Sequence, residues 1–72
     1  MILREYRKDN VFISTVKVTF LKWYGEYETA VSIDNKPLRI LEGYDTEEEA
    51  IKGHNKYKNM SKEELTNFEY IG

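Results

Sequence analysis

The chain has no cysteine, so neither a disulfide framework nor a thiolate metal site can support its fold. No uncharged stretch approaches the roughly 20 residues that a membrane-spanning helix requires. The chain has only 72 residues, and a domain of this size buries about 60% of the surface that its unfolded form exposes. We therefore expect one domain over residues 1–72, with a small core that a second subunit would reinforce.

Neither sign of charge dominates, because 11 Lys and Arg residues face 13 Asp and Glu residues, for a net charge of −2. Such a chain has no overall basic field to attract nucleic acid, and it is too weakly acidic to imitate DNA. Apolar residues at 40% and aromatic residues at 14% are typical of a folded domain. Charged residues begin at Arg4, so no apolar segment of signal-peptide length follows Met1. We expect a soluble cytoplasmic protein without membrane association.

The β-branched and aromatic residues of segment 11–34 predict a long β-hairpin. A turn centred on Tyr24 and Gly25 places Phe20 opposite Thr29 and gathers apolar side chains on one face of the ladder. The other face is mixed, so a shift of one residue would exchange core and surface. This pairing is the register that we predict.

Further strands are expected on both sides of this hairpin. The segment Leu38–Glu42 is predicted to pair with it through Ile40 opposite Val31. Residues 1–7 are compatible with an edge strand or a loose arm, and we favour the strand. Residues typical of turns separate these segments at positions 9–10 and 34–37.

A capping box predicts a helix over residues 46–59, because the hydroxyl of Thr46 can accept the amide hydrogen of Glu49. The acidic residues 47–49 fall in its first turn, where the helix dipole favours negative charge. Consecutive helical positions also point too far apart to converge on one cation. The stripe expected to lie on the sheet consists of Ala50, Gly53, His54 and Tyr57. A glycine is costly in a helix interior, so Gly53 indicates a close approach between helix and strand.

A second capping box, formed by Ser61 and Glu64, predicts a short C-terminal helix that buries Leu65 and Phe68. Strands followed by helices are typical of the α+β class. The predicted architecture is an antiparallel sheet of three or four strands packed on one α-helix, with the short C-terminal helix alongside.

His54 is the only side chain that titrates near neutral pH without a perturbed environment. Its i−4 and i+4 neighbours are Ala50 and Lys58, so no local carboxylate orients the ring. We expect a half-buried structural histidine whose free nitrogen bonds to the backbone of the sheet or of a loop. No glycine-rich phosphate loop, zinc-ligand spacing or nucleophile motif is present. We therefore predict that the protein is not an enzyme and that it takes no cofactor or metal.

Large apolar side chains on a sheet face without cover suggest contact with another chain. In the predicted register Leu21 and Trp23 share the face away from the helix with Val11 and Ile13. The candidate partner-binding residues are Leu21, Trp23 and Tyr24, for another protein or for a homodimer. Two alternatives stay open. In the first, the N-terminal segment or the last helix covers this face. In the second, a bulge turns Val11 and Ile13 inward.

Nucleic-acid binding is the alternative function. Arg4, Arg7 and Lys17 could form a modest basic edge, with Trp23 available to stack on bases. Glutamates near these residues in sequence or pairing dilute that charge. We therefore expect a protein partner rather than nucleic acid.

A pattern in the middle of the chain resembles a known set of proteins. A Tyr-Glu-Thr strand followed by a Tyr-x-Thr-x-x-Glu-Ala-x-x-Gly-His helix is similar to small proteins of tailed phages and prophages of Gram-positive bacteria. The resemblance covers residues 26–58. The matching positions are Tyr27, Glu28, Thr29, Tyr44, Thr46, Glu49, Ala50, Gly53 and His54.

This resemblance implies a viral source and no particular reaction. Together with the small size and the lack of a catalytic motif, it predicts a phage-encoded accessory protein in the cytoplasm of the bacterial host. We expect such a protein to bind a host or phage protein, in host takeover or against a defence system. The motif residues Tyr44, Thr46, Glu49, Gly53 and His54 are predicted to be structural.

Overall fold

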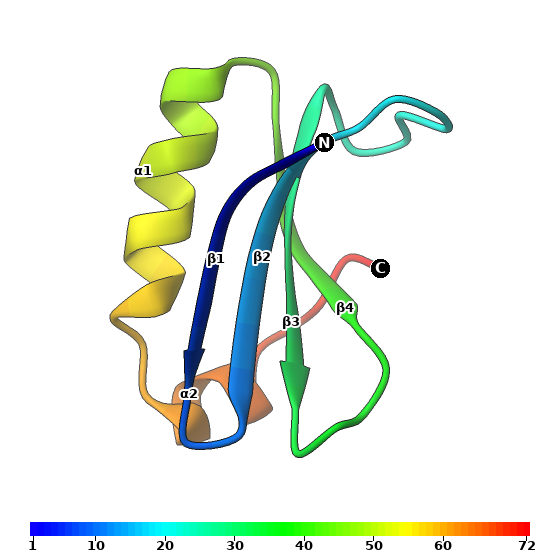
Figure 1. The fold of residues 1–72 in the computed structure, drawn as a ribbon. Helices are drawn as coiled ribbons and strands as arrows, with labels where there is room; N and C mark the ends of the chain where they lie inside the picture. Colours follow the sequence, from blue (N-terminus) through cyan, green and yellow to red (C-terminus); the bar gives the residue numbers. More distant parts are fainter.

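The computed structural model describes all of residues 1–72 and confirms the α+β class, with a four-stranded antiparallel sheet and two helices (Figure 1). The strands lie in chain order across the sheet: β1 (Ile2–Lys8), β2 (Val11–Lys17), β3 (Tyr27–Ile33) and β4 (Arg39–Tyr44). The helices are α1 (Glu47–Lys58) and α2 (Lys62–Thr66). Helix α1 covers one side of the sheet, and the loop between β2 and β3 projects toward the other side (Figure 1). Neither helix is long and apolar enough to cross a membrane.

Two tight turns with positive φ angles fix the ends of the central strands. Asp9 and Asn10 have φ values of 51° and 64°, and they join β1 directly to β2. Asp34 and Asn35 have φ values of 54° and 63° at the end of β3. Both central residues of a type I′ turn need positive φ, which Asp and Asn tolerate better than most residues. The edge strand predicted for residues 1–7 is confirmed as β1 at Ile2–Lys8, which pairs only with β2.

The predicted register of the long hairpin is wrong. Thr29 pairs with Thr15 rather than with Phe20, a shift of five residues along β2 (20 − 15). Because five is an odd number, the opposite face of β2 turns toward the core. Val11 and Ile13 are therefore buried, and they do not lie on the face away from α1. The change of register, without a bulge in the β2–β3 pairing, brings them inward.

The predicted pairing of the last strand is off by one residue. Ile40 lies opposite Ala30 rather than opposite Val31, because the register shifts within the β3–β4 ladder. Leu41 is the extra residue at this irregularity, and its side chain is buried. A bulge of this kind turns a side chain that would face solvent into the core.

Both helices follow the sequence prediction. Thr46 caps α1, and the residues that it buries are Ala50, Gly53, His54 and Tyr57. Ser61 caps α2 with a complete capping box, and Leu65 is buried in the core. The prediction for Phe68 is wrong, because this residue lies beyond α2 and is half-buried rather than buried. Its ring meets the ring of Tyr57 edge to face, with centroids 5.5 Å apart.

The last residues of the chain run beside β4. The amide of Ile71 donates to the carbonyl of Ile40 at 3.0 Å, and the amide of Ile40 donates to the carbonyl of Gly72 at 2.9 Å. These bonds cover the outer edge of β4 near its start. Strand β1 forms the opposite edge of the sheet (Figure 1).

Candidate functional site

Motif residues from three elements meet in a buried polar cluster. Thr29 Oγ1 on β3 lies 2.6 Å from Thr15 Oγ1 on β2, and the hydroxyl of Tyr44 donates to Thr29 Oγ1 at 3.0 Å. His54 Nδ1, on α1, lies 2.8 Å from Thr15 Oγ1. All four residues are buried, and His54 is only 3% exposed. We call Thr15, Thr29, Tyr44 and His54 the threonine–histidine cluster.

The hydrogen bonds of this cluster form one directed chain. Each hydroxyl carries a single hydrogen, so the arrangement that satisfies every group runs from Tyr44 to Thr29, then to Thr15 and then to His54. We assign Nδ1 of His54 as the acceptor, with its proton on Nε2. Burial, followed by the nearby charges of Lys58 and Arg4, lowers the pKa of His54 and favours this neutral form. Burial also raises the pKa of the Tyr44 hydroxyl, which keeps it a donor.

The prediction of a half-buried His54 bonded to backbone is therefore wrong in two respects. The ring is fully buried, and its partner is the side chain of Thr15. Sequence reasoning missed Thr15 because the predicted register turned its side chain to the face of β2 away from the helix. No buried side-chain nitrogen or oxygen in the molecule lacks a partner. A cluster in which three hydroxyls and His54 Nδ1 bond to one another is the arrangement expected of a structural network that fixes how helix and sheet meet.

The other motif residues position the helix. A side-chain carbon at Gly53 would overlap the hydroxyl and ring of Tyr44, so only glycine allows this approach of α1 to the sheet. Thr46 Oγ1 accepts the amide of Glu49 at 3.2 Å, and its hydroxyl donates to the Glu49 carboxylate at 3.0 Å. The carboxylate thus bonds to the side chain of the cap rather than to its amide. Nowhere in the chain do three or more His, Asp or Glu side chains gather at one point.

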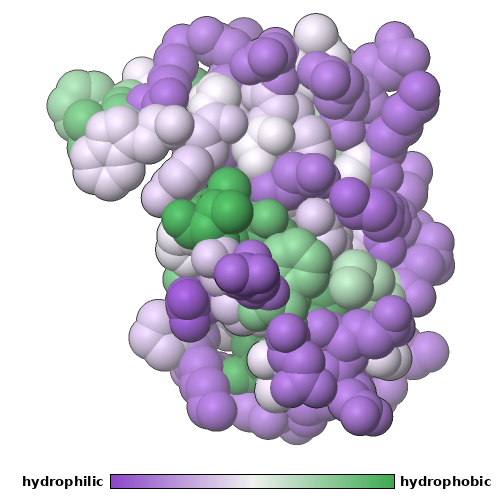
Figure 2. Space-filling model, turned by 180° about the vertical axis from the view of Figure 1, so that it is seen from behind, coloured by the Kyte–Doolittle hydropathy of each residue, from purple (hydrophilic) through white to green (hydrophobic).

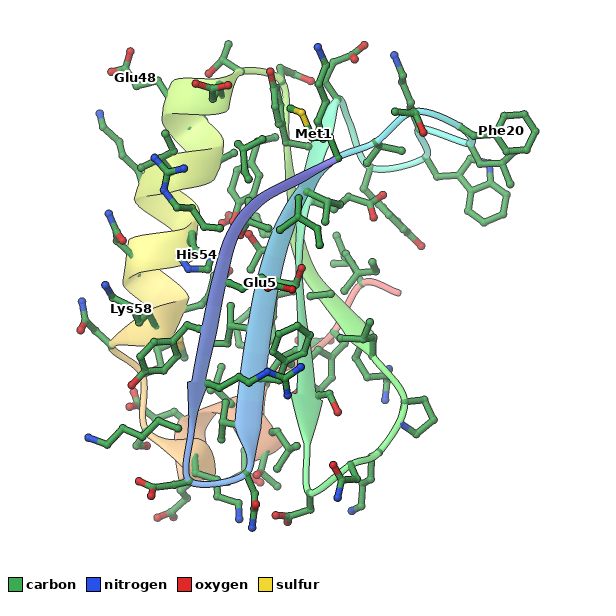
Figure 3. All side chains as sticks on the ribbon, in the orientation of Figure 1. Met1, Glu5, Phe20, Glu48, His54 and Lys58 are labelled. Carbon is green, nitrogen blue, oxygen red and sulfur yellow. The ribbon has the colours of Figure 1, made fainter.

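The candidate partner-binding residues lie outside the sheet, in the β2–β3 loop, which we define as residues 18–26. Phe20, Leu21 and Trp23 are 79%, 54% and 75% exposed. Figure 3 shows Phe20 at the tip of this loop, and Figure 2 shows the loop as a projection from the body of the protein. Phe20 was missed as a candidate because the predicted register paired it within the sheet.

The β2–β3 loop is braced at its base. The amide of Val18 donates to the carbonyl of Glu26 at 2.8 Å, and Lys22 Nζ lies 2.8 Å from the Glu26 carboxylate. Leu21 has a φ of 55°, which is uncommon for a leucine. The amide of Trp23 donates to the carbonyl of Leu21 at 2.8 Å across this bend. The exposed side chains are thus presented by a defined backbone.

Tyr24 has a different role from Leu21 and Trp23, the other two candidate partner-binding residues. It is half-buried, and its backbone lies so close to Gly43 on β4 that a side-chain carbon at Gly43 would overlap it. A side-chain carbon at Gly25 would likewise crowd the backbone of Tyr44. Tyr24 and Gly25 therefore anchor the returning arm of the loop on β4, while Phe20, Leu21 and Trp23 face outward.

The basic residues predicted to form one edge lie on different faces. Arg4 is paired with Thr15, whose side chain points toward α1. Arg7 is paired with Phe12 on the other face, and its guanidinium lies 4.0 Å from the centre of that ring. Lys17 is paired with Tyr27, again on the side of Thr15. The structure does not gather these cations into a single surface.

Comparison of the chain with protein-family models, with curated proteins and with solved structures gives no significant match in any of the three. The similarity of residues 26–58 to phage and prophage proteins therefore stays a prediction from the sequence. Arguments about function rest on the geometry of the β2–β3 loop and on the surfaces around it.

Proposed function

We propose that the protein is a phage-encoded accessory module that binds a host or phage protein through the β2–β3 loop, in the cytoplasm of the bacterial host. The observation that carries this proposal is the exposure of Phe20, Leu21 and Trp23 within four consecutive positions of one braced loop. Small proteins rarely leave such side chains together in water unless a partner covers them. Tryptophan is also among the residues that most often dominate the energy of an interface.

The loop is suited to binding because it is already ordered. Aromatic side chains bury about 150–250 Å² each, so two rings of this size can contribute several kcal/mol to an interface. A braced backbone loses little further freedom when the partner binds. Met1 extends the apolar surface at the base of the loop, since its terminal amino group donates to the carbonyl of Lys17 at 3.1 Å.

The test begins with capture of partners from the lysate of a Gram-positive host, followed by titration of the purified partner. Phe20→Ala and Trp23→Ala are each expected to weaken binding at least about tenfold, as for interface hot spots. Leu38→Ala is the matched control, because Leu38 is also large, apolar and 55% exposed but lies in the β3–β4 connection. Equal losses with the loop variants and the control, or no loss with either loop variant, would contradict the proposal.

Nucleic-acid binding is the second candidate, because exposed Phe20 and Trp23 are also suitable for stacking on bases. The division of the basic residues between two faces of the sheet argues against nucleic-acid binding. It predicts that a labelled single strand shifts on binding and that salt weakens the complex. If the complex forms equally with Phe20→Ala and with Trp23→Ala, stacking on this loop has no part in it.

A homodimer would use the same loop to cover its own apolar side chains. Light scattering of the wild type then gives twice the monomer mass, and Trp23→Ala lowers both the apparent mass and the stability. Because Trp23 is 75% exposed in the single chain, a monomeric wild type should lose almost no stability with this substitution. A monomer would leave the loop available for a different protein.

A further inference from the structure

Strand β1 carries backbone groups that no other part of the chain uses. Lys8 lies opposite Val11, and only the tight turn at 9–10 separates them. The two residues that flank such a turn exchange hydrogen bonds, and bonded positions then alternate with unbonded ones along the ladder. Tyr6 and Lys8 therefore bond to β2, whereas the amides and carbonyls of Glu5 and Arg7 point away from it. These four groups have no partner, because β1 pairs only with β2 and no bond of a turn, loop or cap reaches them.

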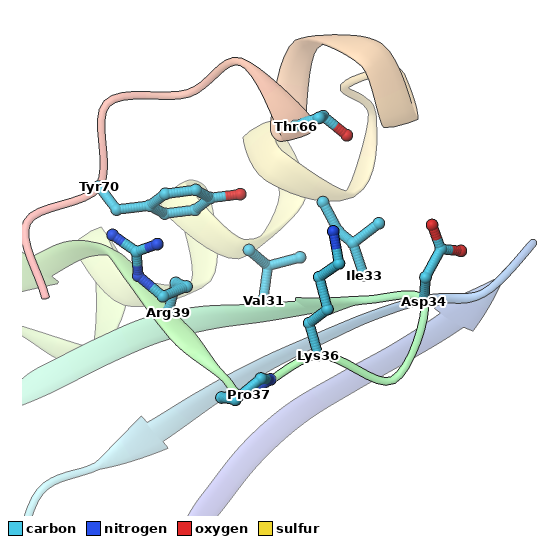
Figure 4. Close-up of a pocket in the computed structure, with 8 residues that line it drawn as sticks. All are labelled: Val31, Ile33, Asp34, Lys36, Pro37, Arg39, Thr66 and Tyr70. Carbon is cyan, nitrogen blue, oxygen red and sulfur yellow. The ribbon is translucent and has the colours of Figure 1, made fainter.

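The opposite edge of the sheet differs, because the chain covers it. Residues 71 and 72 bond to the backbone of β4 near its start. The segment that follows α2 also closes a pocket of about 420 Å³ there, where the centre of the Tyr70 ring lies 4.7 Å from the guanidinium of Arg39 (Figure 4). A row of unpaired backbone groups at a sheet edge is a template for another strand. The structure presents such a row along β1.

The side chains of β1 that face α1 combine positive charge with an apolar centre. Arg4, Tyr6 and Lys8 follow one another at alternate positions on this face, and Tyr6 is half-buried between the two exposed cations. No ion pair of the protein uses Arg4 or Lys8. Lys58, at the end of α1, lines a hollow of about 330 Å³ together with Tyr6 and Lys8, and Asp9 is the one acidic residue there. Positive charge therefore exceeds negative charge on this side of the edge.

These charges decide which strand can pair with β1. Arg4, Arg7 and Lys8 against Glu5 give the strand a net charge of +2 (3 − 1). A second copy of β1 would bring two strands of this charge side by side, which is unfavourable. A strand with negative charge at alternate positions would instead meet Arg4 and Lys8 with opposite charges.

We propose that β1 binds an extended acidic segment of another protein, which joins the sheet as a further strand. The backbone of the segment pairs with the amides and carbonyls of Glu5 and Arg7. Two acidic side chains lie opposite Arg4 and Lys8, and an apolar side chain between them covers Tyr6. In strand addition of this kind, backbone bonds provide affinity and alternate side chains provide specificity. The β2–β3 loop takes no part, so this surface does not depend on the function proposed for the loop.

The test uses a capped peptide, Thr-Glu-Thr-Val-Thr-Glu-Thr, titrated into the ¹⁵N-labelled full chain and followed by NMR. Its two glutamates and its valine share one face, as the proposal requires. A dissociation constant on the order of 1 mM is expected for so short a segment. In the free protein the amides of Glu5 and Arg7 should exchange quickly with solvent, whereas those of Tyr6 and Lys8 are protected by β2. Near saturation the peptide should slow exchange at Glu5 and Arg7 at least about threefold.

Two altered peptides separate charge from backbone pairing. Lysine in place of both glutamates reverses the charge, and N-methylation of the two threonines that flank the valine removes the amides that face β1. Each change should weaken binding at least about fivefold. Equal binding of the lysine peptide, unchanged exchange at Glu5 and Arg7, or shifts confined to residues 18–26 would overturn the proposal.

Lys8→Gln removes one cation of the surface without removing an ion pair of the protein. It should weaken binding of the acidic peptide at least about twofold. Lys36→Gln is the matched control, because Lys36 is an equally exposed class of residue in the β3–β4 connection, and it should have no effect. Trp23→Ala should also have no effect, so failure of the loop proposal and failure of this one are distinguishable. Equal effects of the two lysine variants would contradict a specific site. If exchange at Glu5 and Arg7 slows as the concentration of the protein alone rises, the occupant is a second copy and the proposal is wrong.

Discussion

At the scale of single residues, the buried histidine is the feature that is most sensitive to solution conditions. His54 accepts a hydrogen bond at Nδ1 from Thr15, and a proton on Nδ1 would remove that acceptor. Burial is the main cause that lowers the pKa of His54, and the positive charges of Lys58 and Arg4 add to it. The folded protein therefore prefers the neutral ring, whereas the unfolded chain titrates near the ordinary value of 6.5.

This difference predicts that stability falls on acidification. The unfolded state binds the proton of His54 more readily than the folded state does. The contribution of His54 to the free energy of unfolding is therefore complete above about pH 7.5, and it is lost as the pH falls through 6.5 toward the lower pKa of the folded state. Urea unfolding at several pH values between about 8 and 5.5 measures the slope of the free energy of unfolding against pH. This pH range lies above the usual titration of carboxylates. His54→Gln should be less stable throughout and should lack the slope. A slope that persists in this variant would assign the effect to other groups.

The role of His54 could be predicted only in part from sequence. Its place on the buried stripe of α1 follows from helical spacing, which needs nothing beyond the sequence around it. Its partner Thr15 lies 39 positions away (54 − 15), and the partner depends on which face of β2 meets the helix. A prediction of the register was needed first, and that prediction was wrong.

At the scale of elements, the helices were predictable and the strand pairing was not. Each helix start is encoded within four residues, at Thr46 and at Ser61. The β2 region contains two alternating apolar sets, and both match a strand with one buried face. Val11 and Ile13 belong to one set, and Phe12 and Val16 belong to the other. The tight turn at 9–10 and the long β2–β3 loop select the first set, and this choice is not visible in the alternation itself.

The close approach of α1 to the sheet predicts how a substitution at Gly53 changes the stability of the protein. In an open helix, replacing glycine by alanine is favourable by about 0.5–1 kcal/mol. At Gly53 the added carbon would overlap Tyr44, whose hydroxyl is held by Thr29. Gly53→Ala is therefore expected to lower the free energy of unfolding by about 1–3 kcal/mol, as in overpacked cores. Chemical unfolding measures this change.

Asn55→Ala is the control for helix propensity, because Asn55 is exposed on the same helix and its side chain makes no hydrogen bond. It should be neutral or slightly stabilising. If Gly53→Ala raises stability as much as the control does, the packing of Tyr44 against Gly53 is looser than described.

At the scale of the whole molecule, both edges of the sheet depend on the ends of the chain. Strand β1 forms one edge, and its charged residues Arg4, Glu5, Arg7 and Lys8 discourage pairing with further strands. The other edge is β4, which residues 71 and 72 cover through two backbone hydrogen bonds. The same segment supplies Tyr70 to the pocket beside Arg39. Such contacts join residues far apart in the sequence, so neither the covered edge nor the pocket was predicted from it.

The cover on β4 can be tested with a single position. Ile71→Pro removes the amide that donates to Ile40, whereas Ile71→Ala keeps that amide and trims a side chain that is already 46% exposed. The proline variant should lose about 1–2 kcal/mol of unfolding free energy relative to the alanine variant. It should also speed hydrogen exchange at the Ile40 amide, which bonds to Gly72. An uncovered edge favours pairing between chains, so sedimentation should detect association of the proline variant at high concentration. Equal stability and equal exchange in the two variants would mean that the last residues do not protect this edge.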